Sequence, residues 1–222
     1  MTSIPAKAVG RSIAGVLLVA LTVNMPASRA QSSNSAGGNA YGVFVQTATA
    51  SLVRSPFATM DPTGMGDAAA AAVNVAGVLA AESLGSVTTG VVGENAASAQ
   101  SGSTLQNVNM LGGLITAQLV SGQSSSASNG SIASSDANGS TLAGLVISGV
   151  AVADGTPAPN SQIALPGVGT VTLNEQISRG NGQTASGLTV NMIHVRLKNA
   201  LTGAQTGEII VGAADSDAAF VR

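Results

Sequence analysis

Cysteine and tryptophan are absent from this chain of 222 residues, and its only aromatic residues are one tyrosine and three phenylalanines. The lack of thiols excludes disulfide bonds, thiolate nucleophiles, zinc–thiolate sites and iron–sulfur clusters. So few aromatics predict neither the aromatic anchors of a tight protein interface nor an aromatic platform for binding sugars.

Charge is scarce as well. Only 8% of the residues are charged and 45% are hydrophobic, whereas soluble domains have about 25% charged residues. Eight basic and ten acidic groups give a net charge of −2. This balance excludes a basic nucleic-acid-binding protein, so we expect no nucleic acid partner.

The first thirty residues have the pattern of a secretory signal peptide. Lys7 and Arg11 precede the apolar run from Ile13 to Val23, and small residues follow at Ser28 and Ala30. This run is shorter than the roughly 20 residues of a membrane-spanning helix, so we expect cleavage after Ala30 rather than retention as an anchor. The mature chain would keep five basic and ten acidic groups, and no later apolar run predicts a membrane span.

Turn residues divide residues 31–167 into short segments. Residues 31–40 are rich in Ser, Asn and Gly and predict a flexible lead-in. In the strand predicted over 41–45, Tyr41, Val43 and Val45 share one face and Phe44 takes the other. Proline and glycine predict a loop over 55–67. The remaining expectations are a short helix or turn at 68–72, a strand pair or disorder at 122–140, and one or two buried strands at 142–152.

One short triplet occurs three times. Val73-Asn-Val75, Val108-Asn-Met110 and Val190-Asn-Met192 are nearly identical, and the first two lie in similar blocks about 35 residues apart. They indicate either the coils of a solenoid or repeated hairpins, or they reflect a common strand pattern in a biased composition. Both readings stay open at this point.

The last third of the chain alternates most clearly. In the strand over 168–178, Val171, Leu173 and Ile177 share one face. A strand over 188–198 and a final strand over 208–213 follow. The apolar positions of the 188–198 strand change parity between Met192 and Ile193. The apolar side chains before and after this change cannot all face the core unless the strand contains an irregularity. We therefore predict a β-bulge or sharp bend there.

Together these patterns predict one all-β domain over residues 41–222. Short strands separated by turns, with no amphipathic helix, are typical of an antiparallel β-sandwich or a barrel-like domain. The small residues in the strands make a β-solenoid the second choice.

Several segments, in this order and spacing, resemble the choice-of-anchor P family of exported bacterial proteins. The most specific segments are Pro166-Gly-Val-Gly-Thr-Val-Thr-Leu-Asn-Glu-Gln176 and Val190-Asn-Met-Ile-His-Val195. The resemblance covers residues 40–215. It implies an exported, often surface-attached protein without an assigned activity, and it brings no catalytic residues. No sorting signal or apolar span follows Val211, which favours secretion or non-covalent surface association.

Candidate catalytic and metal-binding groups are few. His194 is the only histidine, and it lies on a predicted strand in phase with Arg196 and Lys198, which favours a half-exposed structural residue. Asp215 with Asp217, or Asp61 with Asp67, could ligate calcium, but no calcium-loop motif is present. We therefore expect no catalytic, cofactor-binding or metal-binding residues.

The sequence thus predicts an exported, non-catalytic protein with a structural or interaction role, whose partners are cell-envelope components or further copies of itself. Two alternatives remain. One is a secreted hydrolase using His194 with Glu175 or Glu208, which requires those groups within hydrogen-bonding reach. The other is a self-assembling β-solenoid adhesin, which requires stacked parallel strands.

Overall fold

The computed structural model describes residues 34–48 and 50–222, and these residues form two packed β-sheets. The strands of sheet A are β1 (Ser35–Thr47), β2 (Ser51–Thr59), β11 (Ser161–Leu165), β12 (Gly169–Gly180), β13 (Ala185–Lys198) and β14 (Gln205–Ala219). Those of sheet B are β3 (Met65–Val75), β4 (Leu79–Val92), β5 (Ala97–Met110), β6 (Ile115–Ser128), β7 (Ala133–Asp136), β8 (Thr141–Ala143), β9 (Val146–Ile147) and β10 (Val150–Ala151). A 3-10 turn, η1 (Leu111–Gly113), joins β5 to β6.

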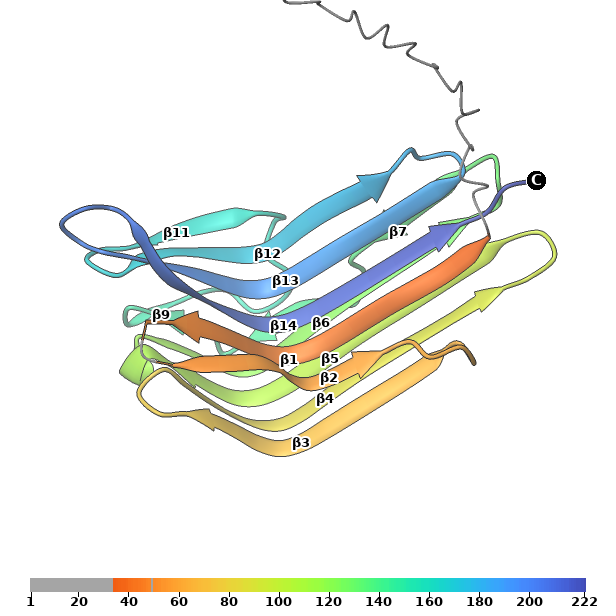
Figure 1. The fold of residues 1–222 in the computed structure, drawn as a ribbon. Helices are drawn as coiled ribbons and strands as arrows, with labels where there is room; N and C mark the ends of the chain where they lie inside the picture. Colours follow the sequence, from red (N-terminus) through yellow and green to blue (C-terminus); the bar gives the residue numbers. More distant parts are fainter. Residues whose placement is uncertain (1–33, 49) are drawn as a thin grey trace, which may run out of the picture. The chain divides into compact units, whose positions relative to one another are not determined.

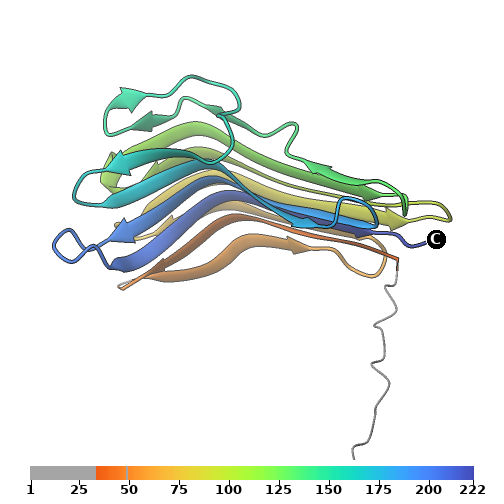
Figure 2. The same cartoon turned by 90° about the horizontal axis from the view of Figure 1, so that it is seen from above.

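All strand pairs are antiparallel. Sheet A has the order β11-β12-β13-β14-β1-β2. Sheet B has the order β10-β9-β6-β5-β4-β3, with β7 and β8 also paired to β6. The sheets face one another as two open layers (Figure 1), and the second view shows the same layers from above (Figure 2). The fold is therefore a β-sandwich, as predicted. Among the described residues, no helix has the length and apolar character needed to cross a membrane.

The solenoid alternative is wrong. A solenoid stacks parallel strands, but every pairing in this chain is antiparallel. Two of the Val-Asn triplets lie in sheet B, on β3 and β5, and they are separated by β4, while the third lies in sheet A on β13. The triplets therefore do not stack on one another and reflect a strand pattern that recurs in a biased composition.

Three local predictions are also wrong. The alanine run at 68–72 lies in β3, because pairing with β4 across the turn at Gly77 overrides the weak helical preference of alanine. Residues 35–40 of the expected lead-in belong to β1, where they pair with β14. The loop expected over 55–67 is shorter, because Pro56 lies within β2 and β3 begins at Met65. The expected signal peptide lies outside the described residues.

Both sheets bend sharply across the middle of their strands (Figures 1 and 2). Residues with left-handed backbone lie inside the strands of both sheets: Asn174 (φ +47°) and Gly212 (φ +71°) in sheet A, and Ser83 and Asn107 (both φ +50°) in sheet B. Few residues other than glycine adopt this conformation. At these positions the alternation of inward and outward side chains changes phase.

The irregularity predicted at Met192–Ile193 is this bend. Asn191 pairs with Ala213 and Ile193 pairs with Val211, so no extra residue enters the register between them. Met192 and Ile193 are both fully buried in the same core. The strand therefore buries the apolar side chains on both sides of the phase change by bending, without an inserted residue.

Because of the same change of phase, two residues do not lie on the faces predicted for them. Ile177 was expected beside Val171 and Leu173, but it follows the left-handed Asn174, pairs with the outward-facing Thr189, and is 50% exposed. Tyr41 was expected on the face of Val43 and Val45. It instead packs with Phe44 and Ile210 in a separate cluster.

On one side of the bend the two sheets enclose large aliphatic side chains. This part, which we call the apolar half, lies toward η1 and the loop between β13 and β14. Its core includes these fully or almost fully buried residues: Met110, Ile115, Leu142, Leu145, Ile193, Val195 and Ile209. Burying a side chain of this size stabilises a fold by about 1.5–3 kcal/mol.

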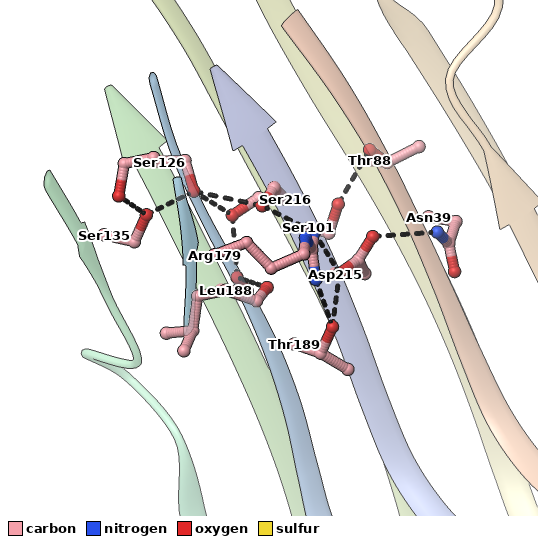
Figure 3. A network of polar contacts seen from close by, with 12 residues as sticks. Asn39, Thr88, Ser101, Ser126, Ser135, Arg179, Leu188, Thr189, Asp215 and Ser216 are labelled. Atoms are coloured by element: carbon pink, nitrogen blue, oxygen red, sulfur yellow. Dashed lines mark hydrogen bonds and ion pairs between the residues drawn. The ribbon is translucent and has the colours of Figure 1, made fainter. Parts of the chain in front are cut away.

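On the other side, which we call the hydroxyl half, small polar side chains fill the space between the sheets. The buried polar residues here include Thr88, Ser101, Ser103, Ser124, Ser126, Ser128 and Ser216. The Oγ atom of Ser216 lies 2.8 Å from that of Ser126 (Figure 3). It also lies 2.7 Å from the Oγ atom of Ser124. Ser124 also donates to the carbonyl oxygen of Leu188 at 2.7 Å. These bonds satisfy hydroxyls that would be costly to bury unpaired.

The sheets approach closely in the hydroxyl half because glycines, which have no side chain, lie on their facing surfaces. A Cβ atom on Gly122 of β6 would lie 2.4 Å from the carbonyl oxygen of Gly212 in the opposite sheet. A Cβ atom on Gly38 would lie 2.4 Å from the Oγ atom of Ser101. No side chain larger than hydrogen fits at these two places without a local shift.

Candidate functional site

Sheet A carries most of the cationic side chains that the structure describes. Of the five Lys and Arg residues in residues 34–222, four lie on β2, β12 or β13: Arg54, Arg179, Arg196 and Lys198. The strands of sheet B carry carboxylates at Asp67, Glu82 and Asp136 but no Lys or Arg. The sandwich therefore has one face on which both signs of charge meet.

The first group on this face surrounds His194, and we call it the histidine cluster. The Nδ1 atom of His194 lies 2.7 Å from the Oε2 atom of Glu175, and its Nε2 atom lies 3.2 Å from the Oε2 atom of Glu208. Asn191 donates to the same Glu175 oxygen at 2.8 Å, and Arg196 donates to the other at 2.5 Å. Both His194 and Glu175 are less than 10% exposed.

The bend creates this cluster. Glu175 follows Asn174, where β12 changes phase, and His194 follows the corresponding position of β13. Both side chains consequently point outward from sheet A. The hydrogen bond from His194, together with those from Asn191 and Arg196, lowers the pKa of Glu175 to about 2 against the opposing effect of burial. Glu175 is therefore an anion at neutral pH.

The histidine cluster meets the distance condition of the hydrolase alternative, because His194 lies within reach of both named carboxylates. In a nucleophile–histidine–acid triad, however, one ring nitrogen faces the carboxylate and the other faces the nucleophile. Here each ring nitrogen faces a carboxylate. The histidine therefore bridges two carboxylates. The predicted half-exposed residue is in fact buried.

The second group lies on the same face toward the hydroxyl half, and we call it the arginine cluster. Its centre is Asp215, which accepts hydrogen bonds from Arg179 at 2.7 Å, Thr189 at 2.6 Å and Asn39 at 3.2 Å (Figure 3). Arg179 also donates to Thr189 at 2.6 Å. These contacts hold the Arg179 guanidinium against the sheet, although its side chain stays 41% exposed.

Arg54 completes the arginine cluster. Its guanidinium carbon lies 5.2 Å from the centre of the Tyr41 ring and 5.5 Å from that of Phe57, distances typical of cation–π interactions. Tyr41 and Phe57 are paired residues on neighbouring strands, and Phe44 packs against Tyr41. Three of the four aromatic side chains thus gather in one area, which the count of aromatics could not reveal.

Two depressions in the surface differ in chemistry. One of about 400 Å³ is lined by the arginine cluster, including Asn39, Tyr41, Arg54 and Asp215. Another of about 540 Å³ lies across sheet B and is lined by neutral side chains such as Thr89, Gln100 and Ser125, with a single carboxylate. Only the first combines cations, an aromatic ring and hydrogen-bond acceptors.

Asp215 and Asp217, which were considered as calcium ligands, make other contacts in the structure. Asp215 is the acceptor at the centre of the arginine cluster, and Asp217 lies beside Gly37 of β1. Burial, and secondarily the neighbouring Asp215, raise the pKa of Asp217. Within the described residues, no group of three or more His, Asp or Glu side chains is arranged to hold a metal ion.

No protein-family model, curated protein or solved structure matches this chain.

Proposed function

We propose that this chain is an exported, non-catalytic bacterial protein with an interaction role at the cell surface or in the medium. The observation that carries the proposal is the gathering of cationic and aromatic side chains on one outer face of the sandwich. Exposed aromatic and arginine side chains are the residue types most enriched where proteins bind partners. The N-terminal signal pattern and the resemblance to the choice-of-anchor P family supply the expected location.

The histidine cluster has a stabilising role in this proposal. A buried histidine between two carboxylates, supported by Arg196 and Asn191, links β12, β13 and β14 across the outer face. Such a network fixes the surface on which the neighbouring arginine cluster lies. It offers no free ring nitrogen for proton transfer to a substrate.

Export is tested by producing the full chain with a C-terminal tag in a bacterial host and fractionating the cells. The expected product has lost thirty residues, begins at Gln31 and is found in the medium or the envelope. Leu18→Arg interrupts the apolar run of the leader and should leave the uncleaved chain inside the cell. An uncleaved wild-type chain in the cytoplasm would contradict the proposal.

The hydrolase is the second candidate, because His194 lies 2.7 Å from Glu175. It predicts hydrolysis of chromogenic ester or glycoside substrates that is abolished by His194→Gln in a chain that still folds. Our proposal predicts no turnover by either chain. A turnover that depends on His194 would replace the proposed function with the enzymatic one.

A further inference from the structure

We propose that the arginine cluster binds the uronate units of an acidic saccharide, with Arg54 contacting the carboxylate. This inference rests on the proposed function, because it names the ligand class of the face described above. The relevant depression has a volume of about 400 Å³, which lies within the usual range of ligand sites.

Arg54 supplies a cation that the protein itself does not neutralise. Its side chain is exposed and lies over two aromatic rings. Among the described residues, the ion pairs of arginine are those of Arg179 with Asp215 and of Arg196 with Glu175, and Arg54 forms none. The guanidinium of arginine carries five N–H donors in a planar fork, and a carboxylate can accept two of them side by side.

The rest of the depression suits hydroxyl groups. Asn39 donates through its Nδ2 atom to Asp215, so its Oδ1 atom remains an acceptor. The Tyr41 hydroxyl is protonated at neutral pH, since its ordinary pKa is 10.0 and burial raises that pKa further, so it can donate to a ligand. Asp215 is fixed by Arg179 and Thr189 and has lone pairs left for a ligand hydroxyl. Donors and acceptors that alternate over a short distance match the hydroxyls of a sugar ring.

The charge of the site selects among anions. Arg54 and Arg179 contribute two positive charges and Asp215 one negative charge, so the lining residues carry a net charge of +1. A single carboxylate balances this charge. A phosphate dianion would face Asp215 across the same depression, and like charges at close range repel. The site therefore favours a monovalent anion that also carries hydroxyl groups.

Binding is measured by isothermal titration of the mature chain with three probes: trigalacturonate, a neutral galactose trisaccharide and sodium sulfate. We expect trigalacturonate to bind at least about tenfold more tightly than either of the others, since one charge-assisted hydrogen-bonded contact contributes that much. Equal binding of sulfate would show a general anion site, and equal binding of the neutral sugar would show that Arg54 has no role. Either result overturns the inference, as does the absence of binding by trigalacturonate.

Variants locate the site. Arg54→Gln should weaken trigalacturonate binding at least about tenfold, whereas Lys198→Gln, an exposed cation of the same sheet outside the depression, should bind like the wild type. Because Arg54 has a positive φ of 28°, the urea midpoint of each variant is checked. Asn39→Ala provides an independent variant and should also weaken binding. Binding unchanged in both site variants would overturn the inference.

The two proposals fail separately. A chain that is exported but does not bind trigalacturonate leaves the exported interaction role intact and removes only the uronate ligand. A chain that remains uncleaved in the cytoplasm removes the exported role, whatever its affinity for sugars.

Discussion

The two halves of the sandwich keep their sheets together by different means. In the apolar half, side chains such as Ile115, Ile193 and Ile209 fill the space between the sheets. In the hydroxyl half the sheets approach until Gly122 nearly touches the backbone of Gly212, and serine hydroxyls bond across the gap. Stability in the first half comes from the area of apolar surface removed from water. In the second it comes from close packing and satisfied hydrogen bonds.

This difference explains how a chain with few large side chains forms a sandwich. Alanine and serine bury little apolar surface, so the hydroxyl half gains little from the hydrophobic effect. The small residues instead bring two backbones together over a long contact. The apolar half then carries the larger share of the stability. We therefore expect truncating a side chain to be most costly in the apolar half, and enlarging one to be most costly in the hydroxyl half.

The largest effect is expected from Ile209→Ala in the apolar half. Ile209 is fully buried, and its truncation should lower the free energy of unfolding by about 2–5 kcal/mol through lost burial and a residual cavity. Urea denaturation measures the change. Leu201→Ala is the control, since Leu201 is 96% exposed and its truncation should change stability by less than about 0.5 kcal/mol. Equal costs for the two would contradict the assignment of the core.

Enlarging a residue should be most costly in the hydroxyl half. Gly122→Ala places a Cβ atom 2.4 Å from a backbone oxygen of the opposite sheet, so the sheets must separate, at a cost of about 1–3 kcal/mol. Gly85→Ala in β4 is the matched control, because its Cβ atom would meet no atom within 4 Å. The control should be neutral or slightly stabilising. A neutral Gly122→Ala would show that the sheets are not in close contact there.

Acid should act with opposite signs on two carboxylates of sheet A, Glu175 at the bend and Asp217 in the hydroxyl half. The pKa of Glu175 is lowered to about 2, so its stabilising contribution is complete above its ordinary value of 4.5 and is lost as the pH falls toward 2. Glu175→Gln should cost about 2 kcal/mol at neutral pH, and this cost should shrink below pH 4.5. Glu82→Gln, at an exposed carboxylate on sheet B, is the control and should cost less than about 0.5 kcal/mol at neutral pH.

Asp217 is the opposite case. Burial raises its pKa above the ordinary value of 3.8, so the ionised group destabilises the fold at neutral pH, and stability is gained as the pH falls through the raised value. Asp217→Asn should therefore raise the urea midpoint slightly at pH 7. The gain should disappear below pH 3.8. A lower midpoint at pH 7 would show that the charge of Asp217 is needed in this half.

The predictability of the fold depended on how clearly each strand alternates in sequence. The strands over 168–178 and 188–198 alternate clearly in sequence, and even the irregularity at Met192–Ile193 was visible as a change of phase. The alanine run at 68–72 has no such signal, because its strand conformation depends on pairing with β4. The outward positions of Ile177 and Tyr41 depend on bends that left-handed residues impose, and these cannot be read from alternation.

The candidate site was predictable only in part. The sequence singled out His194, Glu175 and Glu208 as a possible group, and the structure brings them together. The arginine cluster was missed, because its members come from β1, β2, β12, β13 and β14 and share no motif. The adjacency of these strands, which depends on the sheet order, is what assembles Arg54, Arg179 and Asp215.

The last comparison is between two buried serines of the hydroxyl half, one with hydrogen-bond partners and one without. Ser124 is fully buried and bonds to Ser216 and to the carbonyl of Leu188, so Ser124→Ala should cost about 1 kcal/mol in unfolding free energy. The Oγ atom of Ser103 is buried without a hydrogen-bond partner among the described residues. Ser103→Ala removes a polar atom that was costly to bury and should raise stability by a similar amount. If both variants lost stability equally, volume rather than hydrogen bonding would govern this half.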